Sequence, residues 1–197
     1  MDLFRIAARI ASNDVCVYVD LDETLIHTMR LDVPQNLKKF DGWEGDKIEL
    51  SDSGRPYDGR MGTLLRPGAR EMLNELHSIG PVYLLTYSIN KYASEIVREL
   101  ELGVNEIFSR EDLAGKVGKG QTKFVLIDDL NTLDPMIQTK LKAAGVEESD
   151  SFVEQQAWFE RHHLQVQGFS GSDGDTGLNG IPSRVRMMLE DQNSTSP

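Results

Sequence analysis

Two carboxylates, Asp20 and Asp22, stand directly after an apolar segment near the start of the chain. This segment, residues 15–19, consists of Val-Cys-Val-Tyr-Val and has the length and the β-branched content of a buried strand. In an open α/β sheet, ligands bind beyond the carboxyl ends of the strands. Carboxylates at that place can hold a divalent cation, and one of them can attack an electrophile. Taken alone, the pair is explained better by an acidic turn, since Asp is common in turns.

A second pair of acids could share a metal ion with Asp20. Asp128 and Asp129 follow another apolar segment, Phe124 to Ile127. Adjacent acids after a buried strand are seldom a packing feature, because each ionised carboxylate needs a partner. Mg²⁺ prefers hard oxygen ligands such as carboxylates. Together with the signature described in the next paragraph, these acids predict a Mg²⁺ site that includes Asp20, Asp128 and Asp129.

The segment from Asp20 to His27, Asp-Leu-Asp-Glu-Thr-Leu-Ile-His, resembles the first signature of the haloacid-dehalogenase superfamily of phosphotransferases. It is most similar to the branch that contains the small phosphatases of the RNA polymerase II C-terminal domain and the NLI-interacting-factor-like proteins. An Arg-Pro-Gly helix entry typical of that branch and two further superfamily signatures follow in order, at Leu65–Leu73, Val82–Thr86 and Phe124–Asp129. The resemblance extends from about residue 15 to residue 129.

The resemblance implies a phosphatase mechanism. Asp20 is expected to attack phosphorus and form an aspartyl-phosphate, and Asp22 to protonate the leaving oxygen and later activate water. The backbone carbonyl of Asp22 is expected to bind the metal as well. Thr86 is expected to hydrogen-bond the transferring phosphoryl group, and two further hydroxyls, those of Thr24 and Ser88, to contact the substrate. At the metal, the resemblance favours Asp129 as a direct ligand with Asp128 behind it, and the reverse order stays open.

The superfamily also needs a cation, usually a lysine, that neutralises the nucleophile and the phosphate. The nearest branch carries it in a Lys-Asp-Leu sequence, which a gap-free alignment replaces here with Glu111-Asp-Leu, directly after Arg110. A shortened loop assigns the role to Lys116 instead, with Lys119 and Lys123 as alternatives. We predict Lys116, and Arg110 becomes the candidate if none of these lysines serves.

Strands alternating with helices predict a single α/β domain over residues 1–190, with a Rossmann-like parallel sheet covered by helices on both faces. A β-hairpin insertion within about residues 30–65, in place of a large cap, is expected from two short strands joined by a turn signal. Residues 168–180 are expected to form a mobile loop, and residues 191–197 a disordered tail. The predicted elements are strands at Val15–Val19, Ile48–Leu50, Gly62–Leu65, Val82–Leu85, Phe124–Ile127 and Phe152–Val153, and helices after Pro67, over Tyr92–Leu100 with Gly103 as C-cap, over Pro135–Ala144 and over Ser183–Glu190.

The composition limits the possible classes of protein. The chain has 197 residues with 21 basic and 32 acidic side chains, and its net charge of -11 argues against bulk nucleic-acid binding. The single cysteine, Cys16, excludes an internal disulfide. No apolar stretch approaches the roughly 20 residues that a transmembrane helix needs. We therefore expect a soluble intracellular protein with no membrane partner, cytoplasmic rather than nuclear, with a mitochondrial location left open.

Together these features predict a Mg²⁺-dependent phosphomonoester hydrolase that acts through an aspartyl-phosphate. An open site without a large cap suits a phosphoserine or phosphothreonine of a protein substrate, by analogy with the family. Two alternatives stay open: a phosphatase of nucleic-acid ends or nucleotides, and a non-catalytic protein-binding module of the same fold.

Overall fold

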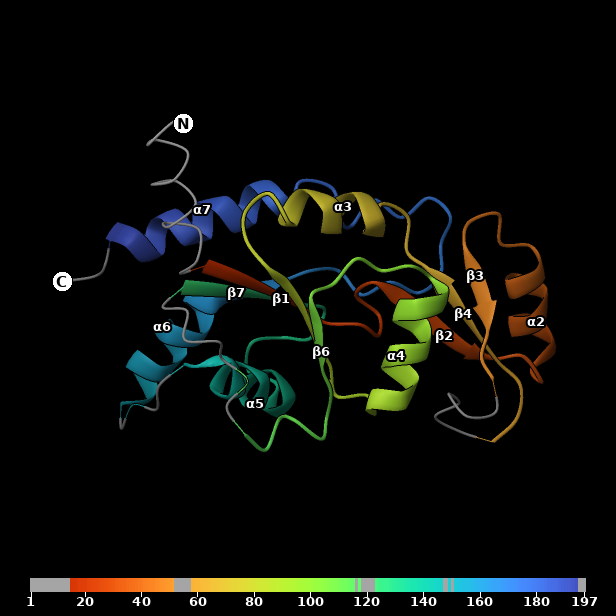
Figure 1. Cartoon of the computed structure of the whole chain (residues 1–197), viewed down its shortest axis with the longest axis horizontal. Helices are drawn as coiled ribbons and strands as arrows, with labels where there is room; N and C mark the ends of the chain where they lie inside the picture. Colours follow the sequence, from red (N-terminus) through yellow and green to blue (C-terminus); the bar gives the residue numbers. More distant parts are fainter. Residues whose placement is uncertain are drawn as a thin grey trace, which may run out of the picture.

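The computed structural model describes residues 15–51, 58–115, 117, 123–146, 149 and 151–194. Its centre is a five-stranded sheet in the order β6-β5-β1-β7-β8, in which every pairing is parallel (Figure 1). The carboxyl ends of these strands therefore share one edge of the sheet. The strands are β1 (Val15–Val19), β5 (Val82–Leu85), β6 (Glu106–Phe108), β7 (Lys123–Asp128) and β8 (His163–Gln165).

Helices cover both faces of this sheet, as the sequence predicts. Successive side chains of a strand point to opposite faces, so β1 needs apolar residues at every position. Val17 and Val19 belong to the core that α3 (Ala69–Leu76), α4 (Asn90–Glu99) and α7 (Ile181–Ser194) complete, whereas Cys16 and Tyr18 face α5 (Pro135–Ala144) and α6 (Phe152–His162). Figure 1 shows α3 and α7 on one side of the sheet and α5 and α6 on the other.

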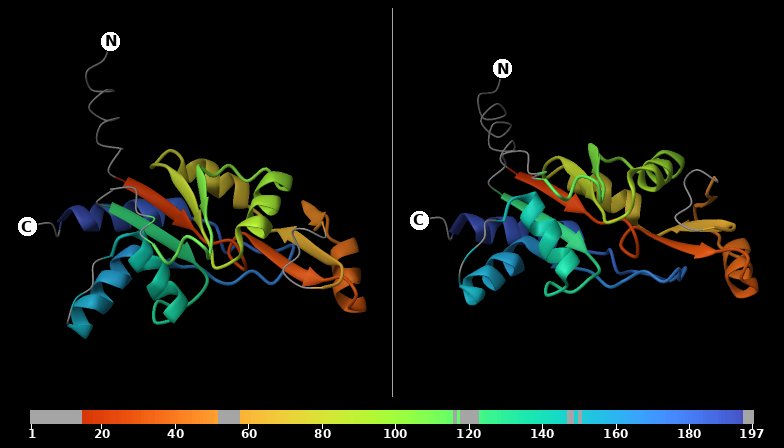
Figure 2. Two further views of the ribbon diagram at one scale, coloured as in Figure 1. Left: turned by 60° about the horizontal axis from the view of Figure 1, so that its bottom comes forward. Right: turned by 90° about the horizontal axis from the view of Figure 1, so that it is seen from below.

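The insertion is a small antiparallel sheet in the order β2-β4-β3, toward which β1 points (Figure 2). The predicted hairpin is present as β3 (Lys47–Glu49) and β4 (Met61–Leu65), while its turn signal Ser53-Gly54 lies outside the described residues. The insertion also contains β2 (Ile26–Arg30) and α2 (Pro34–Asp41), which the sequence did not predict. In α2 only Leu37 and Phe40 are apolar besides the proline, and both are partly buried, so the helix does not stand out from the polar sequence around it.

The prediction of a last strand at Phe152–Val153 is wrong. Both residues begin α6 and are exposed, and β8 follows that helix instead. The side chain of Ser151 accepts a hydrogen bond from the backbone of Glu154, and this N-cap starts a helix despite two β-favouring residues. Local capping thus outweighs the strand propensity of a dipeptide.

Three other boundaries differ from the predictions. Helix α4 ends at Glu99 with Leu100 as its C-cap, well before Gly103. Helix α7 continues to Ser194, so its last turn occupies part of the predicted tail from residue 191 onward; residues 195–197 lie outside the described ranges. The loop at residues 168–180 has no regular structure, yet Phe169 within it is fully buried.

Residues 1–14, which the sequence assigns to the domain, lie outside the described ranges. No helix in those ranges has both the length and the apolar character needed to cross a bilayer.

Candidate active site

The site lies where the carboxyl ends of β1, β5 and β7 meet. Strands β1 and β7 pair in parallel from Val15–Lys123 to Val19–Ile127, so the next residues along each strand, Asp20 and Asp128, stand side by side. The backbone N–H of Asp20 continues the ladder by donating to the carbonyl of Ile127 at 2.9 Å. Both carboxylates are buried. Two neighbouring buried acids require a cation between them.

That cation is Lys140, which the sequence analysis did not single out. Its Nζ donates to Asp20 Oδ1 and to Asp128 Oδ2, each at 2.6 Å, and its side chain is 2% exposed. Helix α5 carries it on the buried face, next to Leu141 and one turn after Ile137. The signal was present in the sequence: a lysine at an apolar position of an amphipathic helix is almost never buried without a partner.

None of the predicted cations that the structure describes lies between Asp20 and Asp128. Lys116 and Lys119 lie outside the described residues, so the role of Lys116 stays a prediction. Lys123 is the first residue of β7, at the strand end opposite Asp128, about 16 Å away at the usual rise per residue. The side chain of Arg110 is exposed.

Burial and the surrounding charges shift the pKa values of this cluster. Burial opposes the charge of Lys140, but the carboxylates of Asp20 and Asp128 outweigh it and raise the lysine pKa. Burial raises the pKa of Asp20, against the effect of Lys140 and together with that of Asp128. Burial and Asp128 likewise raise the pKa of Asp129. Three carboxylates thus lie close to a single ammonium, and a further cation would offset the remaining negative charge.

The donor set fits a magnesium ion. Asp20, Asp128 and Asp129 each offer an oxygen, and these oxygens lie within 4.8 Å of one another. Asp128 is already committed, because its Oδ2 accepts from Lys140 and its Oδ1 from the backbone of Leu130. Among the described residues, Oδ2 of Asp20 and Oδ2 of Asp129 accept no hydrogen bond. This pattern favours Asp20 and Asp129 as direct ligands, with Asp128 behind them.

Asp22 lies on the turn after β1 and accepts two short hydrogen bonds. Ser88 Oγ donates to its Oδ2 at 2.6 Å, and Tyr92 Oη donates to its Oδ1 at 2.5 Å. Burial raises the pKa of Asp22, which the two hydrogen bonds oppose. The turn places Glu23 in the left-handed region, with φ of 59°. Such strain in a non-glycine residue is typical of functional turns.

The three predicted hydroxyls have different partners. Thr86 follows β5, is buried, and accepts a hydrogen bond from the backbone N–H of Ser88 at 3.1 Å. Thr24 donates to Asp129 Oδ1 at 3.3 Å. The Ser88 hydroxyl donates to Asp22, the expected general acid, rather than standing free for the substrate. The structure therefore brings together Asp20, Asp22, Thr24, Thr86, Ser88, Asp128 and Asp129.

Arg66 holds the turn after β1 through a hydrogen bond to its backbone. Its guanidinium is fully buried, donates to the carbonyl of Thr24 at 3.0 Å, and pairs with Asp175 at 2.8 Å. Its plane also lies over the ring of Phe169, 5.5 Å from the centroid. The Arg-Pro-Gly helix entry thus ties the turn after β1 to the loop at residues 168–180.

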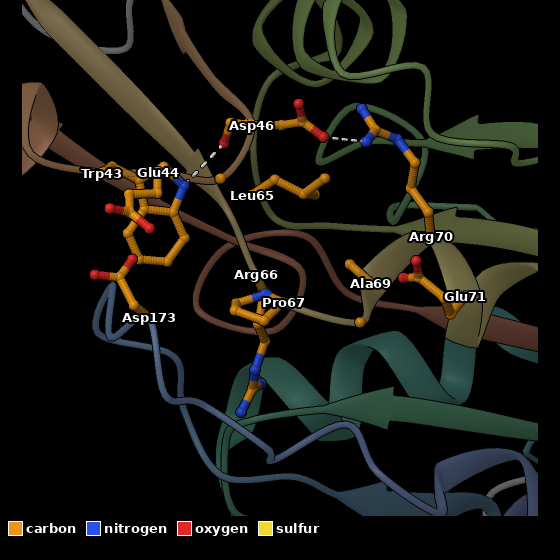
Figure 3. Close-up of a pocket in the computed structure, with 12 residues that line it drawn as sticks. Trp43, Glu44, Asp46, Leu65, Arg66, Pro67, Ala69, Arg70, Glu71 and Asp173 are labelled. Carbon is orange, nitrogen blue, oxygen red and sulfur yellow. Dashed lines mark hydrogen bonds and ion pairs between the residues drawn. The ribbon is translucent and has the colours of Figure 1, made fainter.

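A pocket of about 390 Å³ lies beside Arg66, on the side of the insertion. In the close-up, Asp46 faces Arg70 across the pocket and the Arg66 side chain points away from Asp46 (Figure 3). The acids at the strand ends do not line this pocket. It is therefore separate from the cluster around Lys140.

Comparisons with known proteins agree with this arrangement. A sequence profile of the family described as NLI interacting factor-like phosphatase matches residues 15–190. No curated protein matches the chain significantly. Among solved structures, the chain is similar to a variant of the fission yeast RNA polymerase II CTD phosphatase Fcp1 bound to beryllium fluoride, with a TM-score of 0.54 and 15% identity, over 98% of this chain and 55% of that chain.

A structure described as Fcp1, an essential RNA polymerase II CTD phosphatase, gives a TM-score of 0.49 and 14% identity, over 98% of this chain and 53% of that chain. The chain thus spans about half the length of these solved structures, and at such identity the likeness with the first concerns the fold. The family profile, in contrast, covers most of the chain and every strand end of the site. The chain belongs to the NLI interacting factor-like phosphatase family, in the haloacid-dehalogenase superfamily.

Proposed function

We propose that the protein hydrolyses phosphomonoesters through a phosphorylated Asp20, with Mg²⁺ as its cofactor. The observation that carries this proposal is the buried ammonium of Lys140, which lies 2.6 Å from both Asp20 and Asp128. Phosphate esters resist attack because their oxygens repel a nucleophile. A fixed cation beside a carboxylate offsets that repulsion where it is largest.

In the first step the Asp20 carboxylate attacks phosphorus and the bond between phosphorus and the ester oxygen breaks. The departing oxygen takes a proton from Asp22, which lies two residues away on the turn after β1. Burial raises the pKa of Asp22, which favours its protonated form. Thr86 offers a buried hydroxyl at the end of β5 to the transferring phosphoryl group.

In the second step water attacks the phosphorus of the aspartyl-phosphate. Asp22, now ionised, takes a proton from this water, and the acyl-phosphate bond breaks to release inorganic phosphate and the Asp20 carboxylate. The hydrogen bonds from Ser88 and Tyr92 keep Asp22 in place between the two steps. Asp20, Asp129 and the backbone carbonyl of Asp22 would hold Mg²⁺, which would supply charge neutralisation to the phosphoryl oxygens.

We further propose a phosphoserine or phosphothreonine of a protein as the substrate. Within the described ranges the insertion is a small sheet with one short helix rather than a large cap, and an uncovered site admits a protein segment. The solved relative with the higher TM-score is a phosphatase of a polymerase domain. The net charge of -11 disfavours the alternative substrates, nucleic-acid ends and nucleotides, because they are polyanions.

Release of inorganic phosphate from phenyl phosphate tests the activity. We expect release with Mg²⁺, none in excess EDTA, and a fall to the uncatalysed background for Asp20→Asn. Asp41→Asn, a matched change at an exposed acid at the end of α2, should behave like wild type. No turnover by the wild-type protein, or full turnover by Asp20→Asn, would contradict the proposal.

The substrate class needs a separate comparison. A phosphoserine peptide, a nucleoside 5′-monophosphate and a 5′-phosphorylated oligonucleotide are offered to the same preparation. We expect the highest kcat/KM for the peptide. A higher value for either nucleotide substrate would replace the substrate assignment while leaving the chemistry intact.

A further inference from the structure

A chain of hydrogen-bonded hydroxyls leads from Asp22 into the insertion sheet. Tyr92, on α4, donates to Asp22 Oδ1 at 2.5 Å. The same oxygen of Tyr92 lies 2.7 Å from Thr28 Oγ1 on β2, which in turn lies 2.8 Å from Thr63 Oγ1 on β4. Thr28 and Thr63 are direct cross-strand partners. We refer to Tyr92, Thr28 and Thr63 as the hydroxyl chain.

The hydrogen bond from Tyr92 to Asp22 fixes the direction of the other hydrogen bonds in this chain. The hydroxyl of Tyr92 has a single proton, which it donates to Asp22 Oδ1. Tyr92 then has no proton left for Thr28, and Thr28 must donate to it. The same reasoning makes Thr63 the donor to Thr28. Donors aligned in one direction polarise one another and strengthen the bond to the final acceptor.

The two partners of Asp22 differ in how firmly they are held. Tyr92 is 2% exposed and lies in the core formed with α3 and α7. Ser88 lies on the half-buried segment after β5. The rigid ring of Tyr92 thus sets the place of Oδ1, and Ser88 completes the orientation of the carboxyl group.

We propose that Tyr92, supported by Thr28 and Thr63, is a positioning residue that orients Asp22 for proton transfer to the leaving oxygen. This inference rests on the proposed function, in which Asp22 is the acid. Tyr92 acts through Asp22, so its loss removes alignment rather than the proton itself. The insertion sheet, through Thr28 and Thr63, then helps to hold the acid in place.

A purely structural role for Tyr92 predicts a different kinetic result. If its hydroxyl only satisfies buried polar groups, its removal lowers stability and affects all substrates alike. A misplaced acid, in contrast, harms the substrates whose leaving oxygen needs a proton. Phenyl phosphate needs one, whereas 2,4-dinitrophenyl phosphate releases a stable anion without it.

The test compares kcat/KM for these two substrates, because kcat/KM reports the transfer to Asp20 and excludes the later hydrolysis. For Tyr92→Phe we expect kcat/KM to fall about 10- to 30-fold with phenyl phosphate and less than about threefold with 2,4-dinitrophenyl phosphate. The first figure is part of the about 10²- to 10⁴-fold that general acid catalysis contributes in all. Asp22→Asn gives the upper limit of this selectivity. Tyr18→Phe removes another buried tyrosine hydroxyl, on the far face of β1, and should leave the ratio of the two substrates unchanged.

Thr28→Val keeps the proposal testable if Tyr92→Phe does not fold. It removes the donor to Tyr92, and we expect a smaller selective loss of about two- to fivefold with phenyl phosphate. Equal losses on both substrates, or no loss, in the variant that folds overturn the positioning role, while a selective loss for Asp22→Asn in the same assay leaves the proposed function standing. A wild-type protein that hydrolyses neither substrate overturns both.

Discussion

The ammonium of Lys140 is held by a helix, and this matters for how it stabilises charge. Preorganised charges cost no reorganisation when the transition state forms. Nζ lies between Asp20 and Asp128, and α5 fixes the side chain among buried apolar neighbours. The ammonium of Lys140 is therefore already in position beside the nucleophile before the substrate binds.

We expect Lys140→Ala to lower kcat about 10²- to 10³-fold, because it removes a cation that contacts the nucleophile. Lys142→Ala, an exposed lysine on the same helix, should stay within about twofold of wild type. Measuring both alongside Lys116→Ala decides between the helix lysine and the lysine predicted from the sequence. Near-normal turnover of Lys140→Ala with collapse of Lys116→Ala would assign the role to Lys116.

His163 gives the stability of the protein a specific pH dependence. Burial lowers its pKa to about 4, with Lys140 acting in the same direction and Asp128 against it. Between about pH 6.5, the ordinary value, and pH 4, the unfolded chain binds a proton that the folded protein does not. The contribution of His163 to stability is therefore complete above about pH 6.5 and is lost as the pH falls toward 4.

We expect wild type to lose about 2 to 3 kcal/mol more than His163→Gln when urea unfolding is compared at pH 7 and pH 4.5. The comparison with the variant is needed because Asp20, Asp22 and Asp129 have raised pKa values and change stability in the opposite direction. Equal losses for both proteins would show that His163 titrates normally.

At the scale of elements, the loop at residues 168–180 contacts the Arg-Pro-Gly segment before α3 through the ion pair between Asp175 and Arg66. Arg66 is fully buried and depends on Asp175 for its charge partner, since its other acceptor is the neutral carbonyl of Thr24. Removing one member of a buried pair leaves an uncompensated charge, which costs more than the pair contributes.

We expect Asp175→Ala to lower the free energy of unfolding by about 3 kcal/mol. Asp32→Ala, which breaks the exposed pair with Arg30, should lower the free energy of unfolding far less, because solvent screens that pair. The double variant Arg66→Met, Asp175→Ala should be more stable than Asp175→Ala alone. Urea unfolding of the four proteins, wild type included, measures this, and additive losses in the double variant would contradict the buried-charge explanation.

The end of α7 is also part of the packed structure. Gln192 Nε2 donates to the carbonyls of Phe124 and Arg161 at 3.0 and 2.9 Å, although the sequence predicts a disordered tail from residue 191. We expect Gln192→Ala to cost about 1 to 2 kcal/mol, or roughly 3 to 6 °C in Tm. Glu190→Ala, at an exposed position of the same helix, serves as control. An unchanged Tm for Gln192→Ala would show that these hydrogen bonds do not stabilise the fold.

The elements that sequence reasoning predicted best are those with the strongest apolar patterns. Val15–Val19, Val82–Leu85 and Pro135–Ala144 have the predicted bounds, because buried runs and a Pro-to-Gly helix leave little ambiguity. Helix α2 has only two apolar side chains besides its proline, Leu37 and Phe40, and both are partly buried, so it did not stand out from the polar residues around it. Lys140 was missed for a related reason: its partners are acids from β1 and β7, far away in sequence, and periodicity alone does not reveal a charge pair.

At the scale of the whole molecule, the site depends on segments from most of the chain. Asp20 comes from β1, Thr86 follows β5, Asp128 ends β7 and Lys140 comes from α5. Parallel strands require crossovers, so such convergence at one sheet edge is built into the topology.

The ion pair between Arg66 and Asp175 also affects how the protein is made. The two residues are 109 positions apart, so a growing chain exposes the insertion sheet and the helix entry long before it contains the carboxylate that neutralises Arg66. Domains generally fold as units during synthesis. We therefore expect the turn that carries Asp22 and Thr24 to reach its final shape late in translation, after residue 175 has left the ribosome. A nascent chain stalled before that point would hold the strands of the site but not the contact that fixes their turn.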